Sequence, residues 1–322
     1  MTIRRLLLLG LSVCLAAGAA PLLAQQAGSW PTGQVRIVVP FPPGGPTDAI
    51  SRLFAQKLTD RLGQTFLIEN KPGAGGNIGM DYVAKSKADG HTLLYMNPVL
   101  VTNPYLMKAS VDASLLTPVF QVLNSVPVLL VNPAMPARTV PELLALIRTR
   151  EKSVTCGSVG SVFTVGCALL QHHAKAEVLR VPYRGQGPAM NALISGEIDI
   201  LFDSTITSVP QVKGNRVRAL ATMNSRRGRG PLGELPVVAE TIPGFELFAW
   251  QGLFVPRDTP AALVQKINQE LNAILALPEV TQKLTEFGNE PMGGTPEAFA
   301  RIVRRDSELY GRILQEVGVK PE

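Results

Sequence analysis

The stretch VRIVVPFPPGGPTD, from Val35 to Asp48, decides the fold of this chain. Its first five residues, Val35 to Val39, are β-branched apart from Arg36, which predicts a strand, and the prolines that follow end it because proline lacks an N–H for the strand ladder. Gly44 and Gly45 then allow a sharp turn, and we expect Thr47 or Asp48 to cap a helix. A bare glycine loop at a helix N-terminus suits a carboxylate or phosphate, although an ordinary βα turn explains the pattern equally well.

The same pattern recurs directly downstream. Residues 66–69 predict a second strand, NKPGAGG from Asn70 to Gly76 repeats the glycine-rich loop, and a helix is expected from Asn77 to about Lys85. A third strand at 92–96 completes a βαβαβ unit, which predicts a parallel sheet with both glycine loops at one edge. Open α/β sheets bind ligands at that edge, so the pairing of loops predicts a binding site there.

A second alternation of strands and helices fills the rest of the chain. Strands are expected at 119–123, 128–131, 154–156, 178–181, 198–202, 217–221 and 248–255, and helices at 143–148, 161–172, 189–194, 261–275, 279–287 and 297–316. We place a crossing into a second domain at about residue 125 and the return in the loop 226–236. The sequence thus predicts two α/β lobes, one made of 25–125 and 235–322 and the other of 126–234.

The first 24 residues are typical of a secretory signal peptide. Positive residues up to Arg5 precede an apolar stretch from Leu6 to Leu23, and polar sequence follows at once. An uncleaved membrane anchor is the alternative, but Gly10, Gly18 and Pro21 interrupt the stretch. We therefore expect cleavage after residue 24 and a location in the periplasm.

The charge of the chain indicates no nucleic-acid partner. The formal net charge of +6 falls to +4 when Arg4 and Arg5 leave with the signal peptide. The densest basic cluster, Arg226 to Arg229, lies in a glycine-rich loop and is best explained as a solvated turn.

Cys156 and Cys167 remain after cleavage, and an oxidising compartment would allow them to pair. Cys156 is predicted to end a strand and Cys167 to lie in the second turn of the next helix. A bridge requires Cα atoms within about 7 Å, so we expect two separate buried thiols.

Three long segments resemble a known family: VRIVVPFPPGGPTDAISR, LGQTFLIENKPGAGGNIGMDYVAKSKADGHTLL and VPYRGQGPAMNALISGEIDILFD. With the shorter matches RALATMNSRR, LPVVAETIPGFELFAWQGLFVP and FGNEPMGGTPEAF, they identify the chain as a member of the Bug or TctC family of exported solute receptors, which are related to tripartite tricarboxylate transporters. The resemblance spans essentially the whole mature chain. It implies a type II periplasmic binding protein, in which two α/β lobes joined by two crossing strands close over one small carboxylate.

The resemblance also implies ligand contacts from both lobes. The expected ligand-binding residues are Pro42, Gly44, Gly45, Thr47, Gly75, Gly76, Asn77, Ser158, Gly160, Ser161, Thr164, Asp203, Ser204 and Thr205. The family commonly has Ser-Gly-x-Gly-Ser and then, three residues later, His-Leu. Here the run begins with Cys156, Ser158 replaces a glycine, and Thr164-Val165 replaces His-Leu. These departures bear on the identity of the ligand and leave the fold prediction unchanged.

Some of these residues also have a purely structural explanation. Asp203 could accept a hydrogen bond from a ligand ammonium or hydroxyl, or it could simply cap the next helix. Ser161 and Thr164 could donate to a carboxylate while also capping their own helix.

An exported enzyme is the main alternative function. The sequence contains no Gly-x-Ser-x-Gly motif, its only imidazoles are His91, His172 and His173, and GAGGN lacks the Lys-Ser/Thr ending of a phosphate-binding loop. We therefore expect no catalytic residues, no metal and no cofactor. The expected partners are a small organic acid and either a transporter membrane subunit or a membrane sensor kinase, and the protein is expected to be a monomer.

Overall fold

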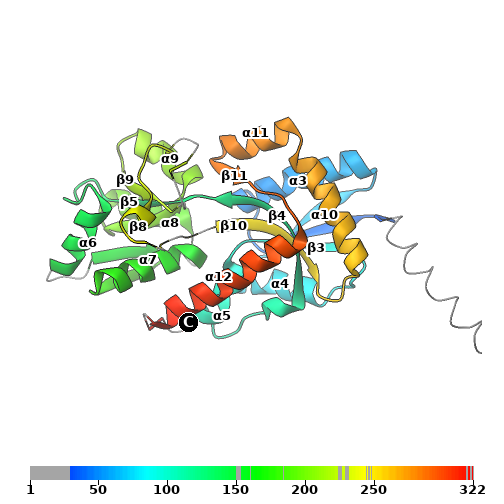
Figure 1. The fold of residues 1–322 in the computed structure, drawn as a ribbon, viewed down its shortest axis with the longest axis horizontal. Helices are drawn as coiled ribbons and strands as arrows, with labels where there is room; N and C mark the ends of the chain where they lie inside the picture. The colour runs from blue at the N-terminus through cyan, green and yellow to red at the C-terminus, as the bar shows by residue number, and fades with distance from the viewer. Residues whose placement is uncertain are drawn as a thin grey trace, which may run out of the picture.

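The computed structural model describes residues 30–149, 154–159, 161–183, 185–223, 227–228, 232–243, 245, 247, 249–316, 318–319 and 321. The predicted signal peptide lies outside the described residues and stays a prediction. The described chain forms two β-sheets with helices on both faces of each sheet (Figure 1).

The first sheet has the strand order β11-β4-β10-β3-β1-β2. Its strands are β1 (Val35–Val39), β2 (Phe66–Asn70), β3 (Thr92–Met96), β4 (Leu116–Ser125), β10 (Ala249–Pro256) and β11 (Asn289–Pro291). The second sheet has the order β7-β6-β8-β5-β9. Its strands are β5 (Pro127–Val131), β6 (Val154–Ser158), β7 (Val178–Pro182), β8 (Ile200–Ser204) and β9 (Arg218–Thr222).

Each sheet with its helices forms one lobe, and the predicted two-lobe α/β fold is confirmed. The helices of the first lobe are α3 (Pro46–Leu62), α4 (Asn77–Ala84), α5 (Val99–Leu106), α10 (Ala261–Leu275), α11 (Pro278–Glu286) and α12 (Pro296–Glu316). Those of the second lobe are α6 (Val140–Thr149), α7 (Ser161–Ala174), α8 (Gln186–Ser195) and α9 (Thr205–Lys213). Short 3₁₀ turns lie at Ala74–Gly76, Ala113–Leu115 and Val238–Glu240.

The strand directions fix where a shared binding site can lie. The chain passes from the first sheet to the second at Val126, so β4 ends and β5 begins at the border between the lobes. β10 is antiparallel to β4 and β3 is antiparallel to β10, so β3 and its parallel neighbours β1 and β2 end toward that border. In the second lobe β8 is antiparallel to β5 and parallel to β6, which is parallel to β7, so these three also end there. The parallel strands of the first sheet (β1, β2 and β3) and those of the second (β6, β7 and β8) therefore all point their carboxyl ends at the same border.

One hydrophobic core runs through both lobes. In β1, Val35, Ile37 and Val39 pack toward α3 and α10, whereas Val38 packs on the other face of the sheet with α4. The cluster around Val38 continues past α5, α12 and α7 to Leu129 in the second sheet. α12 packs against β4 and α5 and also against α7, and Figure 1 shows it reaching from the first lobe toward the second. Both lobes are thus held together on this side of the molecule.

The predicted cap of α3 by Thr47 or Asp48 is wrong. The N-cap is Gly45, the helix begins at Pro46, and no side chain caps it. Proline fits the first helical position because its fixed φ is helical and its missing N–H would have no intrahelical partner there. The side chain of Asp48 turns back instead and accepts a hydrogen bond from the amide of Gly44 at 2.9 Å.

The prediction of two separate thiols is also wrong, because Cys156 and Cys167 form a disulfide. Cys156 lies two residues before the end of β6, and Cys167 lies six residues after the start of α7. Since a strand rises about 3.3 Å per residue and a helix about 1.5 Å, both residues lie at a similar distance from the connecting loop. The helix packs back along the strand, which brings the two Cα atoms to 6.0 Å.

Candidate functional site

The first glycine loop is held by the carboxylate of Asp48, which is 4% exposed. Asp48 accepts hydrogen bonds from the amide of Gly44, from Nε of Arg52 and from Nδ2 of Asn70, each at 2.9 Å. Asn70 also donates to the carbonyl of Phe41 at 3.1 Å, which ties the end of β2 to the loop after β1. Donation by Arg52, and by Gly44 and Asn70, lowers the pKa of Asp48 to about 2 against the opposing effect of burial.

The prediction of bare amides in the two glycine loops is only partly right. The amide of Gly44 is occupied by Asp48, and Pro46 has no N–H, so the first turn of α3 itself offers the amides of Thr47 and Asp48. In the second loop the amide of Gly76 donates to Gly73. Positive φ angles at the glycines of this loop fold it into a 3₁₀ turn, which uses such amides internally. Pro42 and Gly44 are exposed at the tip of the first loop, and Gly45 is half-buried.

Asn77 holds the second loop against the segment that follows α5. Its Nδ2 donates to the carbonyl of Ala109 at 2.8 Å, and its Oδ1 accepts from the amide of Val111 at 3.4 Å. Nδ2 of Asn103 donates to the carbonyl of Gly75 at 3.0 Å. The structure therefore gives the side chain of Asn77 a supporting role in the loop.

The second lobe brings two of the predicted residues into contact. The hydroxyls of Ser158, at the end of β6, and Thr164, in the first turn of α7, are 2.7 Å apart. Only one hydrogen lies between two paired hydroxyls, so the pair retains one O–H that can donate elsewhere. Ser161 begins α7, and the prediction for Gly160 lies outside the described residues.

Asp203 is the buried acid among the predicted site residues, with none of its surface exposed. Oδ2 accepts from the hydroxyls of Thr207 at 2.6 Å and Ser208 at 2.9 Å, so the carboxylate caps the start of α9 through side chains. Among the described residues, Oδ1 has no hydrogen-bond partner. Burial raises the pKa of Asp203 to about 6, although the two hydroxyls lower it.

The raised pKa of Asp203 has a testable consequence for stability. Because the folded-state pKa of about 6 exceeds the ordinary value of 3.8, the folded state binds a proton between these values that the unfolded state has lost. This carboxyl therefore destabilises the fold as the pH rises from about 4 to about 7, by roughly 3 kcal/mol in total. Urea unfolding should show Asp203→Asn gaining stability relative to the unsubstituted protein over this range. A difference between the two proteins that is independent of pH would contradict the assignment.

The next two predicted residues lie where the lobes meet. Ser204 ends β8 and its carbonyl accepts from the hydroxyl of Ser208 at 2.7 Å. Thr205 is buried, and its hydroxyl donates to the carbonyl of Gly288 in the first lobe at 3.1 Å. Thr205 therefore contributes a contact between the lobes.

A buried polar cluster on the crossing strands was not predicted. It consists of Gln121, Asn124 and Ser125 on β4, Gln251 on β10 and Asn289 on β11. Ser125 donates to Oδ1 of Asn289 at 2.6 Å, whereas Oε1 of Gln251 and Nδ2 of Asn289 have no partner in the part of the chain that the structure describes. Amide and hydroxyl residues inside otherwise apolar strands were the signal that could have located these candidates.

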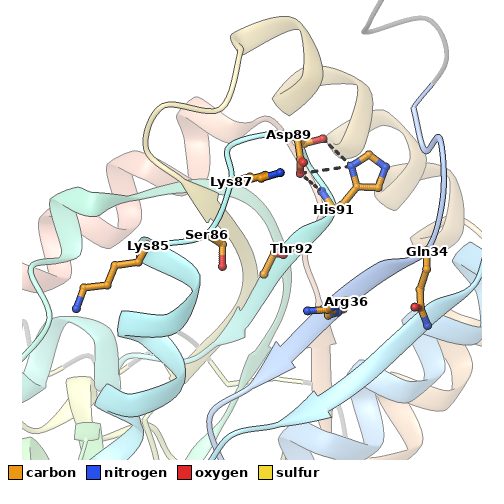
Figure 2. Close-up of a pocket in the computed structure, with 8 residues that line it drawn as sticks. All are labelled: Gln34, Arg36, Lys85, Ser86, Lys87, Asp89, His91 and Thr92. Carbon is orange, nitrogen blue, oxygen red and sulfur yellow. Dashed lines mark hydrogen bonds and ion pairs between the residues drawn. The ribbon is translucent and has the colours of Figure 1, made fainter.

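A separate hollow of about 470 Å³ lies at the opposite edge of the first sheet (Figure 2). It is lined by Gln34, Arg36, Lys85, Ser86, Lys87, Asp89, His91 and Thr92. These residues lie near the starts of β1 and β3, away from the glycine loops that follow the ends of β1 and β2. Lys85 pairs with Asp81 at 2.8 Å, and Arg36 donates to the hydroxyl of Tyr82 at 3.1 Å. Because the hollow lies away from the border at which the parallel strands of both lobes end, we do not assign the ligand to it.

Within the described residues, no three His, Cys, Asp or Glu side chains gather closely enough to hold a metal ion. No helix in that part of the chain has both the length and the apolar character needed to cross a membrane.

Known proteins share this architecture over nearly their whole length. A protein from Pseudomonas sp. (strain P51), the UPF0065 protein in the tcbD-tcbE intergenic region, is 34% identical over 321 residues, which cover 97% of this chain and 94% of that protein. The structure of R. palustris Rpa4515 with adipate matches with a TM-score of 0.81 and 33% identity, over 91% of this chain and 100% of that one. MatC (Rpa3494) from Rhodopseudomonas palustris with bound malate matches with a TM-score of 0.76 and 30% identity, over 88% of this chain and 100% of that one.

A family model described as the tripartite tricarboxylate transporter family receptor, TctC, matches residues 50–319. This match covers well over half of the chain and agrees with the resemblance seen in its sequence. The chain therefore belongs to the TctC family of tripartite tricarboxylate transporter receptors.

Proposed function

We propose that this protein captures a small organic anion, a mono- or dicarboxylate, between its two lobes in the periplasm and presents it to a tripartite tricarboxylate-type transporter. The observation that carries the proposal is the direction of the strands. Both parallel sets end at the border between the lobes, and open α/β sheets bind their ligands beyond the carboxyl ends of such strands.

The choice of a carboxylate rests on relatives and on the groups at this border. Relatives at 33% and 30% identity were solved with adipate and with malate. The second lobe offers the paired hydroxyls of Ser158 and Thr164, and the first turn of α3 offers two amides. Neutral donors of this kind bind an anion without a buried cation, which permits release to a transporter. Asp203 adds an acceptor, Oδ1, that no described residue satisfies, and this suits a ligand hydroxyl or a protonated carboxyl.

A thermal-shift screen of the mature chain tests this function. Adipate, malate and other short carboxylates are compared with glucose and choline, each at a concentration near 1 mM. At least one carboxylate should raise Tm by several degrees, because a ligand at about 100 times its Kd stabilises the folded state by about 2.7 kcal/mol. Isothermal titration calorimetry then measures Kd. If glucose or choline stabilises the protein and no carboxylate does, the proposed function is wrong.

The membrane partner and the lobe boundaries are part of the same proposal. We propose that the first lobe comprises 25–125 and 235–322, that the second comprises 126–234, and that the monomer docks on a transporter membrane subunit after the signal peptide is removed. Copurification of the liganded receptor with that subunit supports a transport role, and copurification with a sensor kinase would replace it with a signalling role.

A further inference from the structure

The binding loop of the second lobe lies inside a covalent ring. The disulfide joins Cys156 in β6 to Cys167 in α7, and the ring encloses residues 157–166. Both cysteines are completely buried. The predicted ligand-binding residues from Ser158 to Thr164 therefore lie in a ring of chain, made of the end of β6, the short connection and the start of α7, whose two ends are joined by the disulfide.

A second link crosses the same ring. The hydroxyl of Ser158, two residues after Cys156, meets the hydroxyl of Thr164, three residues before Cys167, at 2.7 Å. Thr164 is 5% exposed and Ser158 is half-buried, so this bond is partly shielded from competing water. The loop is thus held at two levels, by the disulfide at its base and by the hydroxyl pair closer to its tip.

Glycines next to each cysteine allow strand, helix and β8 to lie close together. A Cβ on Gly157 would lie 2.7 Å from Cδ1 of Ile198, and a Cβ on Gly166 would lie 2.7 Å from the ring of Phe202. Phe202 immediately precedes Asp203 in β8. The ring therefore packs directly against the strand that positions the buried acid.

We propose that the disulfide Cys156–Cys167 and the hydroxyl pair Ser158–Thr164 act together as a brace that positions the second-lobe loop for its ligand. This inference rests on the proposed function. In this role four residues position the loop: Cys156, Cys167, Ser158 and Thr164. The two hydroxyls can contact the ligand directly as well. A loop that is already ordered loses less conformational freedom when the ligand binds, so the brace increases affinity without adding a contact.

The test compares the unsubstituted protein with Cys156→Ala/Cys167→Ala and with Thr164→Val, well below the Tm of each. For the ligand found by the screen, we expect Kd to rise at least tenfold in the first variant and several-fold in the second. Thr164→Ser keeps the hydroxyl and should restore a Kd within twofold of the original. Combining both changes should raise Kd by less than the product of the separate effects, because both act on one loop.

Hydrogen exchange in the ligand-free protein provides a readout that does not depend on the proposed function. Amides in 157–166 should exchange at least tenfold faster in the cysteine variant, whereas those of α10 should not change. The matched control is Ile267→Ala, which leaves a cavity in the first-lobe core at α10. It should lower Tm without altering Kd or the exchange of residues 157–166. Unchanged exchange in the loop, or a Kd within twofold of the original in a cysteine variant that has lost the disulfide, would overturn the brace. Failure of every carboxylate to bind the unsubstituted protein would instead overturn the proposed function, and the exchange result would still decide the brace.

Discussion

The substitution Gly252→Val is expected to lower Tm by roughly 10 °C, through a loss of about 3 kcal/mol in the free energy of unfolding. Gly252 lies in β10, where it pairs with Met96 of β3 and Gln121 of β4. A Cβ there would lie 2.5 Å from the ring of Phe299 and 2.6 Å from the backbone oxygen of Phe120. The oxygen is fixed by the sheet and cannot move aside.

The ring of Phe299 cannot move aside either. It is 1% exposed and packs edge-on against Trp250, with ring centroids 5.3 Å apart, and it also contacts Phe254. Gly33→Val is the control, because no atom of the described residues lies within 4 Å of a Cβ at Gly33. Circular dichroism melting of both variants measures the difference. A normal Tm for Gly252→Val would show that the crossing strands are not packed as described.

The second large effect is expected from Asp48→Ala, which should cost about 3 kcal/mol of stability and at least tenfold in ligand affinity. The substitution removes the acceptor that Gly44, Arg52 and Asn70 share, and so it releases the first glycine loop. Asp48→Asn should be nearly as damaging. Its amide would place a donor against groups that are themselves donors.

Two measurements separate this network from a simple surface ion pair. Arg52 is half exposed, so Arg52→Ala should cost less than about 1 kcal/mol. Because the folded pKa of Asp48, about 2, lies below its ordinary value of 3.8, its contribution is complete above about pH 4 and is lost as the pH falls toward 2. Urea unfolding from pH 2 to pH 6 should show this loss in the unsubstituted protein and not in Asp48→Ala. Equal pH profiles for the two proteins would refute the proposed role of the carboxylate.

Local chemistry determined how much of the fold could be predicted. β1 was predicted at its observed bounds because a β-branched run meets a proline, and both features act within a few residues. The start of α3 was mispredicted because a proline at the first position and a capping side chain are competing local signals. β11 was missed because Asn289–Pro291 has little intrinsic strand preference and is a strand only through its pairing with β4.

Tertiary contacts determined what could not be predicted in the candidate site. The disulfide depends on how far α7 returns along β6, which the sequence of either element does not specify. The amide of Gly44 is likewise bonded to Asp48, and the hydroxyl of Thr205 to the carbonyl of Gly288. The sequence motif alone gives no sign that these two donors are occupied. Sequence patterns thus located the loops at the correct edge, whereas the packing of the loops decided which of their polar groups are already occupied.

The core that passes from one lobe to the other has a consequence for affinity. Trp250 on β10 donates to Asp306 at 3.0 Å, which fixes α12 on the first lobe, and the same helix packs against α7 of the second lobe, so the two lobes are in contact before any ligand binds. The lobes therefore lost most of their freedom to move relative to each other when the chain folded. The proposed carboxylate would therefore have to offset the loss of only a small relative movement of the lobes, which favours binding of a ligand with little contact surface.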